Sequence, residues 1–164
     1  MLYHASRVSG LKVLKPFSHP VVGNEKVVFA TIDKLFALAM TYGSGDVLAA
    51  CYAFNFLTGK REFYIDEIKK GSLQLLKKPA SLYVVVDAVS FHNDSRLHSE
   101  ELISTSEVKI FEEIRIANVF DYLLENGAQI IPYDKVLESM KKRGKDPGKP
   151  KQKHGPERFG VVKR

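Results

Sequence analysis

Residues 81–88, with the sequence Ser-Leu-Tyr-Val-Val-Val-Asp-Ala, constrain the fold more than any other stretch of the chain. The run is apolar almost throughout and rich in β-branched residues, which is typical of a strand buried on both faces. Such a strand lies in the interior of a sheet and needs a layer of structure on each side. We therefore expect a mixed α/β fold of the α+β type.

The rest of the chain supplies shorter strand signals around this central one. Alternation on either side of Thr58-Gly59-Lys60 predicts a hairpin, although residues 47–54 are also compatible with a helix. The other expected strands run from Tyr3 to about Arg7 and over residues 26–30, 102–103 and 110–116, with Phe111, Ile114 and Ile116 in the core.

Three helices are expected between and after these strands. The first covers residues 35–40, is capped by Thr31 or Asp33 and ends at 43–45. A short helix over 122–124 follows Asn118 or Asp121 and ends at 126–127. The last helix begins at 133–134 and continues through residue 140.

Charge divides the chain into a body and a tail. The net charge is +6, but ten of the 25 Lys and Arg residues lie in the Pro- and Gly-rich segment 141–164, beside only two acidic residues. The remaining residues carry 15 basic and 17 acidic side chains, so the body is slightly acidic. We expect one domain over 1–140 and a basic tail over 141–164 that is disordered in isolation.

Several classes of protein are disfavoured by what the sequence lacks. No apolar run is long enough to cross a bilayer, and the start does not have the pattern of a secretion signal. The single cysteine, Cys51, fits a small buried residue in a reducing, cytoplasmic protein. No His, Cys or carboxylate spacing suggests a metal site, and neither a phosphate-binding glycine loop nor a Gly-x-Ser-x-Gly elbow occurs.

Three short stretches, taken in order along the chain, carry the candidate chemistry. The first expected strand contains Tyr3-His4-Ala5-Ser6, and the second, Val28-Phe29-Ala30-Thr31, leads into a helix. The third, Glu101-Leu102-Ile103-Ser104, places a carboxylate at the start of a late strand. This ordered set resembles the ADP-ribosyltransferase-like superfamily, whose members bind NAD between two small β-sheets with flanking helices. The resemblance extends over about residues 1–120.

The resemblance implies a role for each motif. His4 would hydrogen-bond the ribose of NAD, the backbone amide of Ala5 would meet the nicotinamide carboxamide, and Tyr3 would also belong to the cofactor-binding residues. Glu101 would be the catalytic carboxylate, and Glu100 is the alternative register. Because neighbouring strand residues point to opposite faces, at most one of these two glutamates faces a cleft.

The same resemblance assigns the aromatic and phosphate contacts. Phe29 and Tyr42 would hold the nicotinamide ring, although simple core packing also explains both. Ser6, Arg7 or Thr31 would lie near phosphate or ribose. Three positions differ from the family pattern: Ala5 stands where glycine is common, Ser6 stands where threonine is common, and the second motif lacks a tyrosine unless Phe29 replaces it.

The activity implied is NAD-dependent transfer of ADP-ribose to a protein, nucleic acid or small-molecule acceptor. A carboxylate would stabilise the oxocarbenium character that develops on the ribose as the bond to nicotinamide breaks. Two alternatives stay open. One is an NAD-dependent RNA 2′-phosphotransferase on the same scaffold. The other is a non-catalytic module that contacts nucleic acid or an acidic protein through residues 141–164.

Overall fold

The predicted central strand lies in the interior of the larger sheet. A computed structural model describes residues 1–42, 47–86 and 90–142 of the chain. Strand β7 (Ala80–Val85) lies between β1 (Leu2–Ser6) and β10 (Glu112–Ile116), antiparallel to both, and all six of its residues are buried. The prediction of a central strand is confirmed as far as Val85, and residues 87–88 lie outside the described residues.

Strand β4 (Lys26–Thr31) extends this sheet and pairs with three different partners. It pairs with β1 near its C-terminal end, with β3 (Phe17–Ser18) near its N-terminal end, and with β8 (Glu101–Ser104) along Val28–Thr31. A separate ribbon joins β2 (Val13–Leu14) to β9 (Val108–Lys109).

A second, three-stranded sheet contains the predicted hairpin. Strand β5 (Leu48–Asn55) is antiparallel to β6 (Lys60–Glu67), and β11 (Gln129–Ile131) adds in parallel on the other side of β6. The helical alternative for residues 47–54 is wrong. Alternate residues of β6 are buried, which is the pattern of a strand with one covered face. Residues Leu48–Asn55 pair with β6 along their whole length and are therefore a strand as well.

The helices begin at side-chain caps. Asp33, rather than Thr31, caps α1 (Lys34–Met40), and Asn118 caps α3 (Val119–Glu125). Helix α4 (Tyr133–Lys142) ends two residues beyond the expected boundary of the body. Neither α2 (Leu73–Leu76) nor the 3-10 turn η1 (Pro20–Val22) was predicted.

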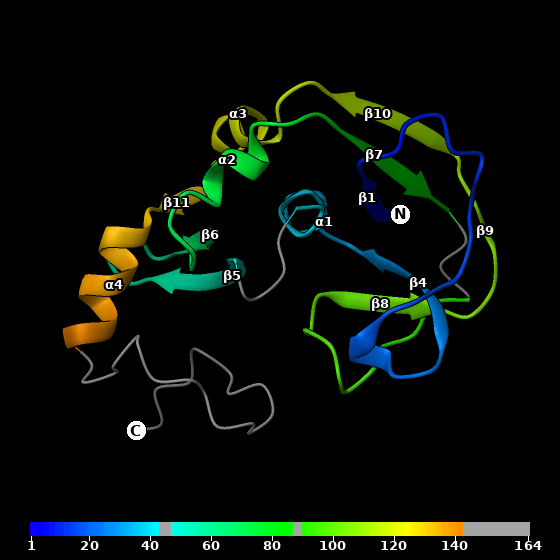
Figure 1. Cartoon of the computed structure of the whole chain (residues 1–164), viewed down its shortest axis with the longest axis horizontal. Helices are drawn as coiled ribbons and strands as arrows, with labels where there is room; N and C mark the ends of the chain where they lie inside the picture. The colour runs from blue at the N-terminus through cyan, green and yellow to red at the C-terminus, as the bar shows by residue number, and fades with distance from the viewer. Residues whose placement is uncertain (43–46, 87–89, 143–164) are drawn as a thin grey trace.

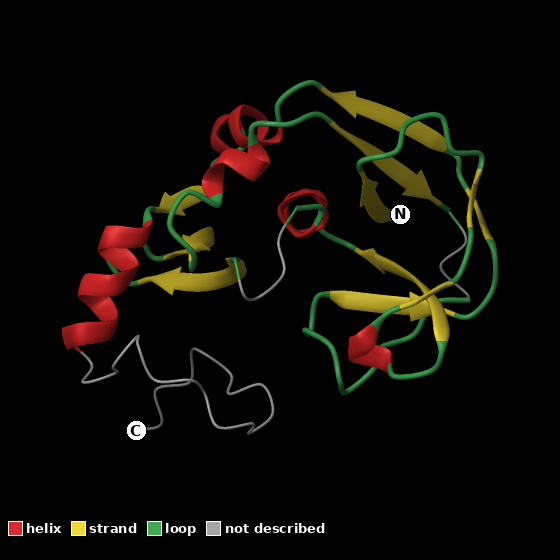
Figure 2. Cartoon of the chain, in the orientation of Figure 1, coloured by secondary structure: helices red, strands yellow, loops and turns green. Residues whose placement is uncertain are grey.

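Helix α1 lies between the two sheets and connects their cores. Figure 1 shows it end-on, between the strands of the larger sheet and β5 and β6, and Figure 2 shows the same arrangement by element type. Its buried Phe36 and Leu38 belong to one cluster with Ile65 of β6 and Leu82 of β7. The fold is therefore mixed α+β with open sheets, as the sequence predicts. Phe111, expected in the core, is 72% exposed because it lies just before β10.

Residues 143–164 lie outside the described residues, and so does the expected end of the first helix at 43–45. The division into a body over 1–140 and a basic tail over 141–164 therefore stays a prediction.

Candidate functional site

The candidate site is a gap in the larger sheet between β1 and β4. The two strands pair at only one position, Tyr3 with Thr31. Beyond this pair, β1 remains paired with β7 and β4 remains paired with β8. The backbone of β4 from Val28 to Ala30 is therefore not paired with β1.

The side chain of His4 reaches from β1 to β4 at this gap. On the β8 side, Phe29 is opposite Ile103, but both backbone groups of Ile103 hydrogen-bond to His92, at 3.0 and 2.9 Å. The Phe29 carbonyl therefore faces the other edge of β4. There the His4 side chain takes the place of a backbone amide, because its Nδ1 lies 2.8 Å from the Phe29 oxygen.

This hydrogen bond determines the chemical state of the imidazole. A carbonyl oxygen can only accept, so Nδ1 carries the proton. Burial lowers the pKa of His4, an effect that the bond to Phe29 partly opposes. The ring is then neutral near pH 7, and Nε2 offers a lone pair. No described residue hydrogen-bonds to Nε2, which is free to accept a proton or a hydrogen bond from a ligand.

A pocket of about 360 Å³ opens beside His4. Its polar groups come from His4, Ser6 and Lys15, and Ser6 also accepts a hydrogen bond from the Val8 amide at 3.1 Å. The apolar part of the lining consists of Leu11, Val13, Leu14, Phe17 and Val28. One neutral imidazole, one hydroxyl and one ammonium on an apolar wall suit a small ligand with hydroxyl and anionic groups.

Two side chains hold the loop that forms one wall of the pocket. Tyr83 is fully buried beside His4; its hydroxyl donates to the Val8 carbonyl at 2.7 Å and accepts from the Leu11 amide at 3.2 Å. Glu113 accepts from Ser81 at 2.7 Å and from the Gly10 amide at 3.0 Å. These bonds lower the pKa of Glu113 and tie the loop to β7 and β10.

The three sequence motifs lie on adjacent strands. Tyr3 is opposite Thr31, and Thr31 is opposite Glu101, so one row crosses β1, β4 and β8. Two strand spacings separate the ends of the row by roughly 10 Å. The side chain of His4, the residue after Tyr3, lies on the same face of the sheet as Tyr83. The side chain of Glu101 lies on the opposite face, with that of Thr31. The pocket lining includes His4 and Ser6 but not Glu101.

The two glutamates before and at the start of β8 have different partners. Glu101 accepts a hydrogen bond from the His98 amide at 3.0 Å. Glu100 is turned toward the smaller sheet, where it forms a 2.8 Å ion pair with Arg61. The Arg61 guanidinium lies 4.6 Å from the Tyr52 ring, so Glu100 belongs to a contact between the two sheets.

The aromatic candidates do not line the pocket. The ring of Phe29 packs beside Phe17 and His19, at centroid distances of 5.7 and 5.2 Å. Tyr42 donates a hydrogen bond to the Pro79 carbonyl, and the guanidinium of Arg7 lies 5.9 Å from its ring. Both rings therefore have packing partners in the structure, as the core-packing interpretation expects.

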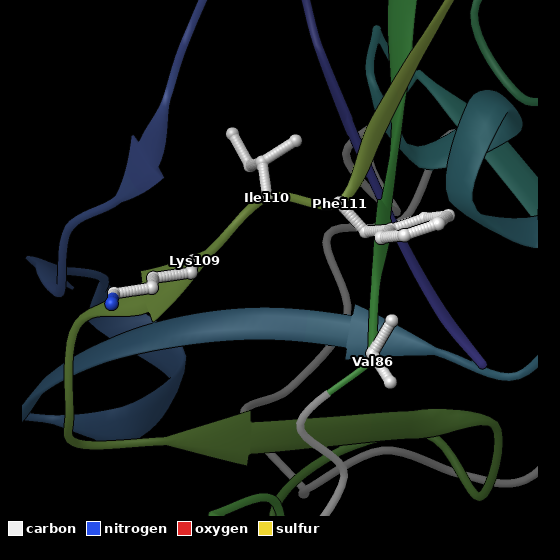
Figure 3. Close-up of a pocket in the computed structure, with 4 residues that line it drawn as sticks. All are labelled: Val86, Lys109, Ile110 and Phe111. Carbon is white, nitrogen blue, oxygen red and sulfur yellow. The ribbon is translucent and has the colours of Figure 1, made fainter.

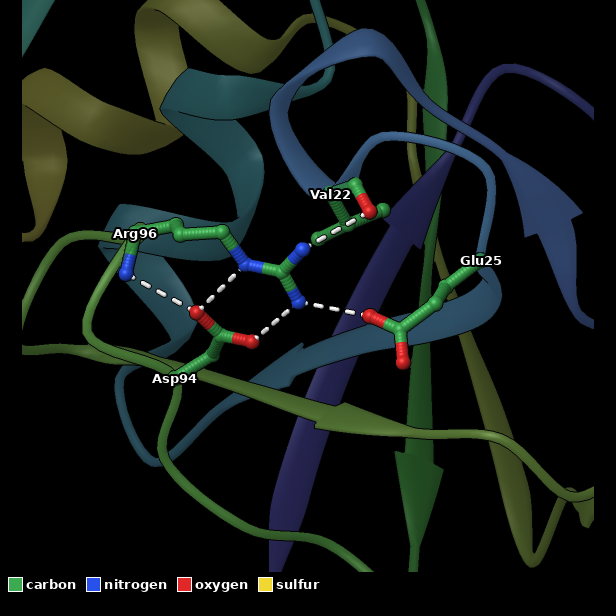
Figure 4. Close-up of polar contacts among 4 residues, drawn as sticks. All are labelled: Val22, Glu25, Asp94 and Arg96. Atoms are coloured by element: carbon green, nitrogen blue, oxygen red, sulfur yellow. Dashed lines mark hydrogen bonds and ion pairs between the residues drawn. The ribbon is translucent and has the colours of Figure 1, made fainter.

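A polar anchor holds the segment that leads into β8. Figure 4 shows Arg96 bonded to Asp94, Glu25 and the Val22 carbonyl. Arg96 lowers the pKa of Asp94 to about 2. Through these contacts the segment before Glu101 is fixed to the turn between β3 and β4.

A second surface hollow, of about 370 Å³, lies beside the segment that joins β9 to β10. Figure 3 shows its lining of Val86, Lys109, Ile110 and Phe111. It is mostly apolar and offers a single charged group, so it lacks the mixture of polar groups found beside His4.

Other kinds of site receive no support from the described part of the chain. Among these residues there is no group of three His, Cys, Asp or Glu side chains that could hold a metal ion. None of the described helices is long and apolar enough to span a membrane. No family model matches the sequence, and neither the curated proteins nor the solved structures include a significant match to the chain.

Sequence reasoning missed Lys15 and the apolar wall of the pocket. Residues 10–16 read as an irregular segment, and nothing in their spacing indicates that they fold back over His4. The relevant signal was the tyrosine in the central strand, since a buried Tyr hydroxyl requires polar partners from another segment.

Proposed function

We propose that this protein binds NAD at the gap between β1 and β4 and transfers ADP-ribose to an acceptor. The observation that carries the proposal is the His4 side chain, which lines the pocket, has Nδ1 fixed on the Phe29 carbonyl and has no hydrogen-bond partner for Nε2 among the described residues. A hydrogen-bond acceptor such as Nε2 suits a ribose hydroxyl, which can donate a hydrogen bond to it. Ser6 and Lys15 then lie within the same pocket for the phosphates.

The reaction requires a carboxylate near the ribose carbon. The bond from that carbon to the nicotinamide nitrogen breaks, and its electron pair leaves with nicotinamide. The acceptor nucleophile forms the new bond and gives its proton to a base or to water. Glu101 is the proposed carboxylate because it lies in one row with Tyr3 and Thr31 and has no ion-pair partner among the described residues. Since His4 and Glu101 leave the sheet on opposite faces, the proposal requires one ligand to reach both through the gap between β1 and β4.

The matched pair Glu101→Gln and Glu100→Gln tests this assignment. Each change removes one negative charge and keeps the side chain's size, so the two variants differ only in position. With labelled NAD and a cell extract, we expect Glu101→Gln to lose label transfer and nicotinamide release by at least about 100-fold, the usual scale for losing one stabilising group in the transition state. Glu100→Gln should retain most of the activity. If both variants match the wild-type protein, Glu101 is not catalytic.

A second candidate function is nucleotide binding without transfer. It is favoured by the absence of Glu101 from the pocket lining and by its hydrogen bond with the His98 amide. Thermal shift with NAD, ADP-ribose and nicotinamide separates the two functions, because ligand binding to the folded state raises the melting temperature. Stabilisation by ADP-ribose that is lost in His4→Asn, without nicotinamide release by the wild-type protein, would favour the binding function.

A further inference from the structure

Strand β5 forms an unprotected edge of the smaller sheet. It pairs with β6 on one side, and no described strand pairs with its other side. The sequence from Leu48 to Asn55 is Leu-Ala-Ala-Cys-Tyr-Ala-Phe-Asn, which has no charged residue, no proline and no glycine. An edge of this length with unpaired backbone groups is a template for another strand.

The other sheet edges in the described residues are protected. Strand β10 carries Glu112, Glu113 and Arg115 among its five residues, and β2, β3, β9 and β11 have only two or three residues each. Strand β8 has four residues, and His92 bridges its outer edge at Ile103. Natural proteins protect their edges with charges, short strands and covering segments, and β5 has none of these devices among the described residues.

Apolar side chains gather at the end of this edge. Phe54 is 54% exposed, and Phe56 and Leu57 in the following turn are 90% and 97% exposed. The rings of Phe54 and Phe56 contact each other at 5.1 Å between centroids. An exposed cluster of large apolar side chains beside an open edge marks an interaction surface.

We infer that β5 pairs with the β5 of a second copy of this chain, antiparallel about a twofold axis, to form one continuous six-stranded sheet. A twofold axis perpendicular to the sheet keeps each face continuous, so residues opposite each other must share a face. The register with Cys51 on the axis meets this condition and aligns seven residues of β5 from each copy.

The side chains of β5 suit pairing with themselves. In this register Ala49 faces Ala53 of the second copy, and Leu48 faces its Phe54. Like charges opposite each other would oppose such pairing, but the uncharged β5 brings none together. A twofold axis restricts the pairing of two identical strands to registers with one residue on the axis, and the one with Cys51 there brings the apolar side chains of Leu48 and Phe54 together. A second copy is therefore the occupant that the edge fits best.

Pairing of two strand edges buries less surface than the roughly 1,200 Å² of a stable interface, so the dimer should depend on concentration. In sedimentation velocity with the full chain, we expect the mass to rise with concentration from 18.5 kDa toward about twice that value. Ala53→Lys, which puts a charge on the pairing edge at an exposed position, should keep the mass of one chain. Thr58→Lys adds the same charge in the exposed turn beyond the strand and should still dimerise.

Two further measurements keep the inference testable if Ala53→Lys does not fold. Cys51 is the only thiol, and on the axis it should give a disulfide-linked dimer under mild oxidation. Backbone amides of β5 should exchange more slowly with deuterium as concentration rises, while those of β10 stay unchanged. A single-chain mass at every concentration, or an equal effect of the two lysine variants, would overturn the inference.

Discussion

Replacing Tyr83 by phenylalanine tests how the wall of the pocket is held. Tyr83 is 0% exposed, and its hydroxyl makes two hydrogen bonds to backbone groups of the pocket loop, with Val8 and Leu11. The change removes one oxygen and leaves both backbone groups without that partner. At about 1 kcal/mol for each bond, we expect the free energy of unfolding to fall by about 2 kcal/mol.

The assay is thermal and urea unfolding of the full chain. For a domain of this size, 2 kcal/mol corresponds to a decrease in melting temperature of about 4–8 °C. Tyr64→Phe is the matched control, because it removes the same oxygen from a hydroxyl bonded to Glu62 in the less buried β6 hairpin. We expect this control to change stability much less. Equal melting temperatures for Tyr83→Phe and the wild-type protein would refute the reasoning that the hydroxyl fixes the loop.

Three other predictions follow from single contacts. Because burial lowers the pKa of folded His4 below its unfolded value, folding should lose stability as the pH falls below about 6.5, and urea titrations of His4→Asn should show a weaker loss in that range. Asp33→Ala removes the cap on the Phe36 amide and the partner of the Tyr52 hydroxyl; it should cost about 1 kcal/mol or more in urea unfolding, while Asp33→Asn retains most of the cap. A methyl group at Gly127 would meet only open space, but the φ of +87° there disfavours any L side chain, so Gly127→Ala should cost about 1 kcal/mol in the same assay through backbone conformation alone.

Local sequence patterns were sufficient for most of the secondary structure. The apolar run in β7, the turn at Thr58–Lys60 and the caps at Asp33 and Asn118 each act within a few residues. Their physical causes, which are side-chain burial, turn geometry and capping hydrogen bonds, can therefore be read from neighbouring residues. Phe111 was placed wrongly because its apolar character does not say that the strand begins only at the next residue.

The site needed contacts between distant segments. The sequence by itself determined that a histidine strand, an aromatic strand and a glutamate strand occur in that order. Only the tertiary structure decided that β1 leaves β4 after one pair, that Nδ1 of His4 replaces the missing amide, and that Lys15 lines the same pocket as His4. Strand pairing is set by which faces the whole chain can bury together, and no short window of sequence contains that information.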